Sequence, residues 1–185
     1  LGYCMGGNLA LALALHRQTE VAGLAVLATP WDFHAEDEGS AHRLAATAQA
    51  IEGQLTAIGE LSTDMLQLLF CMLDPLLGYR KFQSFARMDP SSARANDFVA
   101  LEDWLNDGVP MVAAVAQECL GGWYGENEPA RGSWRIDGNV VDPTGFRKPS
   151  IAIIPARDRI VPPASAQALA SALPSCETHT PQTGH

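Results

Sequence analysis

Cysteine is scarce in this chain. The four cysteines occur in 185 residues without a CxxC pair and without a metal-like spacing to the five histidines; they are Cys4, Cys71, Cys119 and Cys176. A chain this large and poor in cysteine does not depend on a disulfide framework. We therefore expect reduced thiols in a cytoplasmic protein, and no metal site.

Positive charge and long hydrophobic runs are also limited. Twelve lysines and arginines stand against 21 aspartates and glutamates, and the net charge of −9 argues against general nucleic-acid binding. The longest strictly apolar run, from Leu9 to Leu15, is far shorter than the roughly 18 to 20 residues of a membrane span. We therefore expect no nucleic-acid partner and no transmembrane segment.

The two ends of the chain suggest a piece of a longer protein. It begins at Leu1 without an initiator methionine and ends at Gly184-His185, inside a motif. We expect targeting signals, if any, to lie outside these residues. The hydrophobic content of 47% still provides for a large core.

Five apolar segments predict an α/β fold. Residues 5–17 alternate leucine and alanine, but alanine favours helix strongly, so we predict a helix buried nearly all round. Short apolar runs bounded by proline predict buried parallel strands. The predicted order is helix 5–17, strand 21–29, strand 150–154, helix 163–173 and strand 176–180. This order is typical of the C-terminal half of a doubly wound, mostly parallel sheet.

A long insertion separates the first and second of these strands. About 118 residues, 31–148, exceed the dozen or so that a crossover requires. Helical patterns over 41–59, 61–73 and 93–119 predict a mainly helical cap. We therefore expect three parts: residues 1–30 and 149–185 in the core, and residues 31–148 in the cap.

A candidate nucleophile lies at the start of the chain. Gly2-Tyr3-Cys4-Met5-Gly6 fits the nucleophile-elbow pattern G-x-S-x-G with cysteine in place of serine. A helix pattern follows at once, as the elbow requires. The alternative is a buried structural cysteine in a glycine turn. We favour a catalytic Cys4, with the Met5 backbone N–H as one oxyanion donor.

An acid and a histidine follow in the expected order. Asp158 comes just after the strand at 150–154, where the catalytic loops of such sheets gather, although a turn or cap role is also common for aspartate. His185 follows the last predicted strand. We predict a Cys4, Asp158 and His185 triad, and assign structural or solvated roles to the other histidines, which are His16, His34, His42 and His179.

Together with further segments of the chain, these motifs resemble the sequence pattern of one enzyme family. Gly2-Tyr3-Cys4-Met5-Gly6-Gly7 and Ala28-Thr29-Pro30-Trp31-Asp32-Phe33 resemble polyhydroxyalkanoate synthases, α/β-hydrolase-fold enzymes whose lipase-like box carries cysteine. Further matches to the general pattern of that family lie at 101–110, 123–127, 156–163 and 184–185. The resemblance spans nearly the whole chain and implies the α/β-hydrolase fold.

The resemblance also implies an activity. It implies an acyltransferase that polymerises (R)-3-hydroxyacyl-CoA through an acyl thioester on Cys4, with Asp158 and His185 as acid and base. No cofactor is implied, because the CoA thioester is a substrate. Implied partners are the growing polyester chain or granule surface, and a homodimer partner or a second synthase subunit.

Two other classes remain open. An esterase, a thioesterase or a dienelactone hydrolase-like enzyme also fits the elbow, but the acid of dienelactone hydrolase follows its nucleophile without a cap of this size. A granule-associated protein without catalysis would be expected to lose one triad member.

Four residues are candidate substrate-binding positions. Trp31 and Asp32 lie in a family-like segment, although packing is the alternative for Trp31 and Asp32 is the next candidate for the acid. Arg147 and Lys148 belong to residues 131–159, which hold six basic residues against three acidic ones. This stretch suits the phosphates of CoA, and surface pairing with acidic groups is the alternative.

Overall fold

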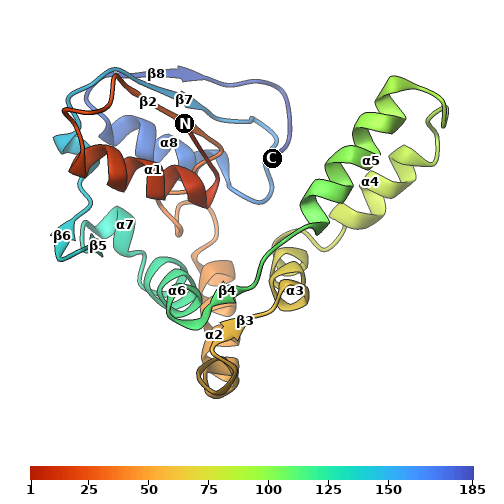
Figure 1. Ribbon diagram of the computed structural model, residues 1–185, viewed down its shortest axis with the longest axis horizontal. Helices are drawn as coiled ribbons and strands as arrows, with labels where there is room; N and C mark the ends of the chain where they lie inside the picture. Colours follow the sequence, from red (N-terminus) through yellow and green to blue (C-terminus); the bar gives the residue numbers. More distant parts are fainter. The chain divides into compact units, whose positions relative to one another are not determined.

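The computed structural model describes all 185 residues, except for the side chains of Ala48, Gln54 and Leu73. The chain divides into two compact units (Figure 1). The core unit comprises Leu1–Gln49 and Glu118–His185, and the inserted unit comprises Ala50–Gln117. Within the described residues, every helix is too short or too polar to cross a membrane.

The core unit is organised by a parallel sheet of four strands in the order β1-β2-β7-β8. The strands are β1 Gly2–Tyr3, β2 Leu24–Leu27, β7 Ser150–Ile153 and β8 Cys176–His179. Leu24 is paired with Ser150 and Leu27 with Ile153, so strands far apart in sequence are neighbours. The predicted α/β class is confirmed, with a large insertion between the strands predicted at 21–29 and 150–154, which are β2 and β7.

Two helices build the core below this sheet in the view of Figure 1. They are α1 (Met5–His16) and α8 (Pro163–Ala172), which begins with proline in its first turn. Leu11 and Leu169 are fully buried in the same apolar cluster. Leu9 and Leu13, in contrast, are 48% and 62% exposed. A helix was predicted at 5–17 and is present at 5–16, but the prediction of burial nearly all round was wrong, because only one face contacts the core.

The predicted cap boundaries differ from those of the inserted unit. The core unit also contains the first part of α2 (Glu38–Ile58), and Trp123, Trp134 and Phe146 are buried in its apolar cluster. The rings of Trp123 and Trp134 meet edge to face at 5.0 Å between centroids. The remaining elements of this region are a π-helix at Glu118–Gly125, α7 Glu128–Arg131, β5 Arg135–Ile136, β6 Asn139–Val140 and a 3-10 turn at Pro143–Gly145.

The inserted unit is mainly helical, as predicted. It contains the end of α2, then β3 Glu60–Leu61, α3 Thr63–Leu73, α4 Leu77–Phe85, α5 Ala93–Asn106, β4 Met111–Val112 and α6 Ala113–Gln117. Ser62 and Ser92 cap α3 and α5, each accepting a hydrogen bond from a backbone N–H three residues later. Phe85 stacks on Phe98 with 4.4 Å between ring centroids, which joins α4 to α5.

Close backbone approach at the elbow depends on Gly2 and Gly7. A Cβ atom on Gly2 would lie 2.5 Å from the Gly6 carbonyl oxygen, and one on Gly7 would lie 2.6 Å from Thr29 Cγ2. A Cβ atom on Gly6 would meet nothing within 4 Å. The second glycine of the G-x-C-x-G pattern is therefore not the one that packing requires.

We expect Gly7→Ala to destabilise the protein strongly and Gly6→Ala to be tolerated. Thr29 is 2% exposed and has no room to move, and overpacking of this kind costs about 1–3 kcal/mol or more. Alanine at position 6 has free space, and its effect should stay within about 1 kcal/mol. Urea unfolding of the two variants checks the difference, and equal losses in both would contradict it.

Candidate active site

Cys4 lies on a strained turn between β1 and α1. Its φ of 50° and ψ of −130° fall in a region that non-glycine residues rarely adopt. The backbone N–H of Cys4 donates to the Leu27 carbonyl at 2.9 Å, which extends the pairing of β1 with β2 into the turn. Met5 is the first residue of α1, so its N–H has no intrahelical acceptor. The local geometry is that of a nucleophile elbow.

Asp158 lies in the loop that follows β7, at the carboxyl edge of the sheet. It is 6% exposed. Its Oδ1 accepts hydrogen bonds from the backbone N–H groups of Ile160 and Val161, both at 2.9 Å. Its Oδ2 faces His185 Nδ1 at 2.7 Å. The carboxylate is thus held by the backbone on one side and presents its other oxygen to the imidazole.

The segment that carries His185 is attached to the loop of Asp158. Ala156 N–H donates to the Pro181 carbonyl and Arg157 N–H to the Thr183 carbonyl, each at 2.9 Å. The Arg157 guanidinium also donates to the Gln182 carbonyl. These bonds continue the β7–β8 ladder beyond both strands. They explain how a short segment after β8 can hold the imidazole at a defined position.

Several groups set the charge of His185. Burial acts to lower the pKa of its imidazole, but hydrogen bonds to Asp158 and Cys4, and the negative charge of both, raise that pKa to about 9. A carboxylate can only accept, so Nδ1 carries a proton toward Asp158. The Tyr3 ring lies 5.0 Å from the His185 ring, centroid to centroid. The three predicted catalytic residues are therefore brought together.

We expect the raised pKa of His185 to appear as a pH-dependent contribution to stability. The contribution is complete below the ordinary value of 6.5 and is lost as pH rises toward 9, because the folded protein holds the proton more tightly than the unfolded chain. The unfolding free energy of the protein minus that of a His185→Gln variant should fall across this window in urea titrations. A difference that stays constant with pH would contradict the prediction.

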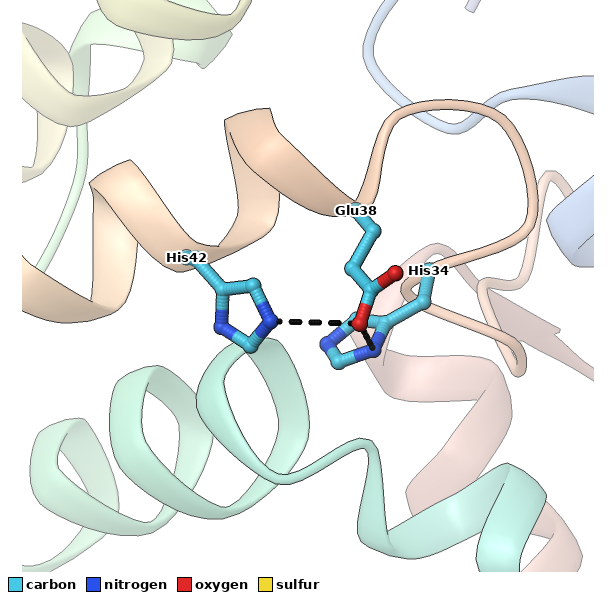
Figure 2. Close-up of side chains that lie close together, drawn as sticks. All are labelled: His34, Glu38 and His42. Atoms are coloured by element: carbon cyan, nitrogen blue, oxygen red, sulfur yellow. Dashed lines mark hydrogen bonds and ion pairs between the residues drawn. The ribbon is translucent and has the colours of Figure 1, made fainter.

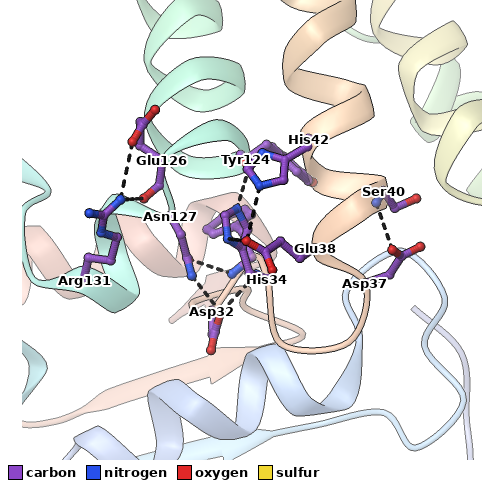
Figure 3. Close-up of polar contacts among 11 residues, drawn as sticks. Asp32, His34, Asp37, Glu38, Ser40, His42, Tyr124, Glu126, Asn127 and Arg131 are labelled. Atoms are coloured by element: carbon purple, nitrogen blue, oxygen red, sulfur yellow. Dashed lines mark hydrogen bonds and ion pairs between the residues drawn. The ribbon is translucent and has the colours of Figure 1, made fainter.

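Trp31 and Asp32 support the core unit. Trp31 is 4% exposed, and its backbone N–H donates to Ser165 Oγ at 3.1 Å. Asp32 Oδ1 accepts a hydrogen bond from Asn127 Nδ2 at 2.8 Å and one from the His34 backbone N–H at 3.0 Å (Figure 3). Asn127 Oδ1 in turn accepts from the Phe33 N–H. This network fixes the loop after β2, and it does not join Asp32 to His185.

The structure does not bring Arg147 and Lys148 to the candidate triad. Both residues precede β7, whereas Asp158 follows it, so they lie at the opposite edge of the sheet. The Arg147 backbone N–H donates to Gln18 Oε1, just beyond the end of α1. Of the basic stretch, Arg157 and Arg159 are the residues that flank Asp158 in the loop.

Two tyrosines near Cys4 were not singled out from the sequence. Burial raises the pKa of Tyr3 to about 12, with further contributions from the charges of Cys4 and Asp158. Burial likewise raises the pKa of Tyr124, with Cys4 and Cys119 adding to the effect. Both phenols therefore stay protonated at neutral pH. Tyr3 adjoins Cys4 in sequence, but nothing in the sequence indicated Tyr124.

The chain is similar in sequence to proteins named as polyhydroxyalkanoate polymerase subunits. The chain is 30% identical to the Poly(3-hydroxyalkanoate) polymerase subunit PhaC of Synechocystis, over 99% of this chain and 50% of that protein. It is 26% identical to the protein of the same name from Haloarcula marismortui, over 100% of this chain and 40% of that protein. The predicted resemblance is confirmed, and the chain spans half or less of these relatives.

The fold has relatives among solved structures as well. The monoacylglycerol lipase of Paleococcus ferrophilus superposes with a TM-score of 0.52 at 14% identity, covering 100% of this chain and 58% of the lipase. This likeness concerns the fold alone. The model of the alpha/beta hydrolase fold family matches residues 1–185. With its parallel sheet, its elbow and this match over its whole length, the chain belongs to the alpha/beta hydrolase fold family.

Proposed function

We propose that this chain is the catalytic part of an acyltransferase that polymerises (R)-3-hydroxyacyl-CoA into a polyhydroxyalkanoate. The observation that carries the proposal is the His185–Asp158 hydrogen bond of 2.7 Å, with Cys4 on its elbow close enough to raise the pKa of His185. The similarity to two proteins named as polyhydroxyalkanoate polymerase subunits supports the substrate class.

The first half-reaction would transfer an acyl group from CoA to Cys4. The Cys4 thiol gives its proton to His185 and its sulfur attacks the thioester carbonyl, so a carbon–sulfur bond to Cys4 forms and the bond to the CoA sulfur breaks. The departing thiolate takes a proton from the His185 imidazolium. One thioester replaces another, so the step is nearly isoenergetic and the acyl group stays activated. The Met5 N–H, at the positive end of α1, would stabilise the oxyanion.

The second half-reaction would extend the polyester. The 3-hydroxyl of an acyl unit attacks the Cys4 thioester, and neutral His185 takes the hydroxyl proton. An ester bond forms, the bond to Cys4 breaks, and the Cys4 sulfur takes the proton from His185, which regenerates the thiol. Asp158 holds the imidazole with its Nδ1 proton inward, so Nε2 serves as the base. Asp158 therefore positions the imidazole and stays a carboxylate throughout the reaction.

Product analysis tests the proposal against a hydrolase. The intact protein is incubated with (R)-3-hydroxybutyryl-CoA, and CoA release is followed with a thiol reagent. The proposal expects CoA release together with an oligomeric or polymeric ester. Release of CoA with only the free hydroxy acid would mean that water accepts the acyl group, and the chain would then be a cysteine-dependent thioesterase. No release of CoA would overturn both assignments.

A further inference from the structure

A second cluster of reactive side chains lies at the start of α2, apart from the candidate triad. It consists of His34, Glu38 and His42, spaced four residues apart. His34 lies in the turn before the helix, Glu38 is its first residue, and His42 is one turn further on. Figure 2 shows the Glu38 carboxylate pointing toward both imidazole rings.

The three side chains converge on one oxygen. Glu38 Oε1 lies 3.3 Å from His42 Nε2 and 3.7 Å from His34 Nδ1. One ligand atom from each residue lies within 4.8 Å of the other two. In a tetrahedral zinc site with metal–ligand bonds of about 2.0–2.2 Å, neighbouring ligand atoms are about 3.3–3.6 Å apart. The cluster therefore needs only small side-chain adjustments to coordinate one ion.

The outer ring nitrogen of His34 is already fixed. His34 Nε2 lies 2.8 Å from the Tyr124 carbonyl oxygen (Figure 3). A carbonyl oxygen can only accept, so Nε2 carries the proton and the neutral ring has its lone pair on Nδ1. Metal-binding histidines characteristically donate their second N–H to a carbonyl or carboxylate in this way.

This tautomer leaves an electrostatic mismatch that a cation removes. In the neutral ring, the His34 Nδ1 lone pair faces the negatively charged Glu38 oxygen at 3.7 Å. Two electron-rich atoms at this distance repel each other unless a positive charge lies between them. Glu36 and Asp37 add further negative charge to the same turn. The nearest cationic group in this segment, Arg43, pairs with Asp37 at 3.4 Å.

We propose that His34, Glu38 and His42 bind one divalent transition-metal ion, with Zn²⁺ as the best match to two imidazoles and one carboxylate. His42 has a side chain 53% exposed and Glu38 one 67% exposed, so water can complete the coordination. His34, at 18%, anchors the site from the inner side. No metal was expected from the sequence, and both histidines were assigned to structural or solvated roles.

The ion would act as a structural clamp. Through His34 it would connect the start of α2 to Tyr124, which lies in the π-helix. The turn at 33–37 would then be held from both sides, by Asn127 through Phe33 and Asp32, and by the metal through His34. This role is independent of the proposed acyl transfer.

Zinc titration of the intact protein tests the proposal. Because Cys4 and His185 can also bind zinc, the titration is made in a Cys4→Ala background after treatment with EDTA. Calorimetry with ZnCl₂ should show one equivalent bound, and His42→Ala and Glu38→Gln should each weaken that binding at least about ten-fold. The control is His179→Ala, because His179 is 54% exposed and lies 2.9 Å from Glu177, a pair similar to His42 and Glu38.

Each outcome decides the proposal. Loss of binding in His42→Ala and Glu38→Gln, with binding retained in His179→Ala, supports the site. Unchanged zinc binding in the two cluster variants would place the ion elsewhere, for example on the exposed thiol of Cys71, and would overturn it. Absence of bound zinc in the parent protein would overturn it too. Thermal unfolding without metal checks that all variants are folded.

Discussion

Replacing Cys4 by alanine should abolish acyl transfer from CoA and leave the protein folded. The change removes the sulfur that would carry the acyl group, while the turn, the Leu27 hydrogen bond and α1 depend on the backbone. Loss of a nucleophile of this kind typically costs about 10⁶ in kcat. The rate of CoA release, measured beside circular dichroism of the variant, checks both parts of the prediction.

A matched variant and an adduct make the Cys4 assignment specific. Cys71 is exposed and lies in the inserted unit, so Cys71→Ala should retain the activity of the parent. Mass spectrometry of protein quenched during turnover should find the acyl group on the peptide of Cys4. An adduct on another cysteine, or substantial turnover by Cys4→Ala, would defeat the proposed mechanism.

Asp158→Asn should reduce kcat by about 10⁴, the loss known for the equivalent change in a serine-protease triad. Asp158 Oδ1 accepts two backbone N–H groups, so an asparagine would place its oxygen there. Its NH₂ group would then face His185 Nδ1. An amide N–H can only donate, so the imidazole would have to move its proton to Nε2, on the side of Cys4.

Asp32→Asn provides the comparison, because Asp32 was the other acid that the sequence offered. Its carboxylate accepts hydrogen bonds from the Asn127 side chain and from the His34 backbone N–H, and neither bond involves His185. The loss of kcat should therefore be much smaller than in Asp158→Asn. Steady-state rates for both variants, at a pH where the parent is active, decide the matter. A larger loss in Asp32→Asn would move the acid to that position.

The elements of the core could be predicted because their residues carry strong local signals. Alanine content outweighed the alternation in residues 5–16, and a β-branched run between prolines marked the strand at 150–153. The helix α4 was missed, because it follows Asp74-Pro75 closely and contains glycine and polar residues. The β5–β6 hairpin has a signal that was not used, the Asp137-Gly138 turn with φ of 50° and 76°.

The boundary of the cap was harder to predict, because it depends on which residues are buried in the core of the sheet. Trp123, Trp134 and Phe146 are typical of any packed interface, and only the fold shows that they complete the core of the sheet. Their segment therefore belongs to the core unit, and the inserted unit is confined to 50–117. Composition alone does not distinguish the two arrangements.

The site was predictable in its chain order but not in its fine contacts. The order of Cys4, Asp158 and His185 indicated the triad. The backbone fork that holds Asp158 Oδ1, and the need for Gly7 where the motif pointed to Gly6, are properties of three-dimensional packing. The His34, Glu38 and His42 cluster had a signal in its four-residue spacing, but its Tyr124 partner is 90 residues away.

The backbone conformation at position 4 lowers the stability of the protein for any residue other than glycine. A non-glycine residue in such a region costs about 1–3 kcal/mol, in a fold whose whole stability is of the order of 5–15 kcal/mol. Glycine would adopt the observed φ of 50° at the least cost, and glycine is the one residue with no side chain to react. Selection for stability alone would therefore favour glycine at position 4, and the proposed role of Cys4 as the nucleophile accounts for a cysteine there.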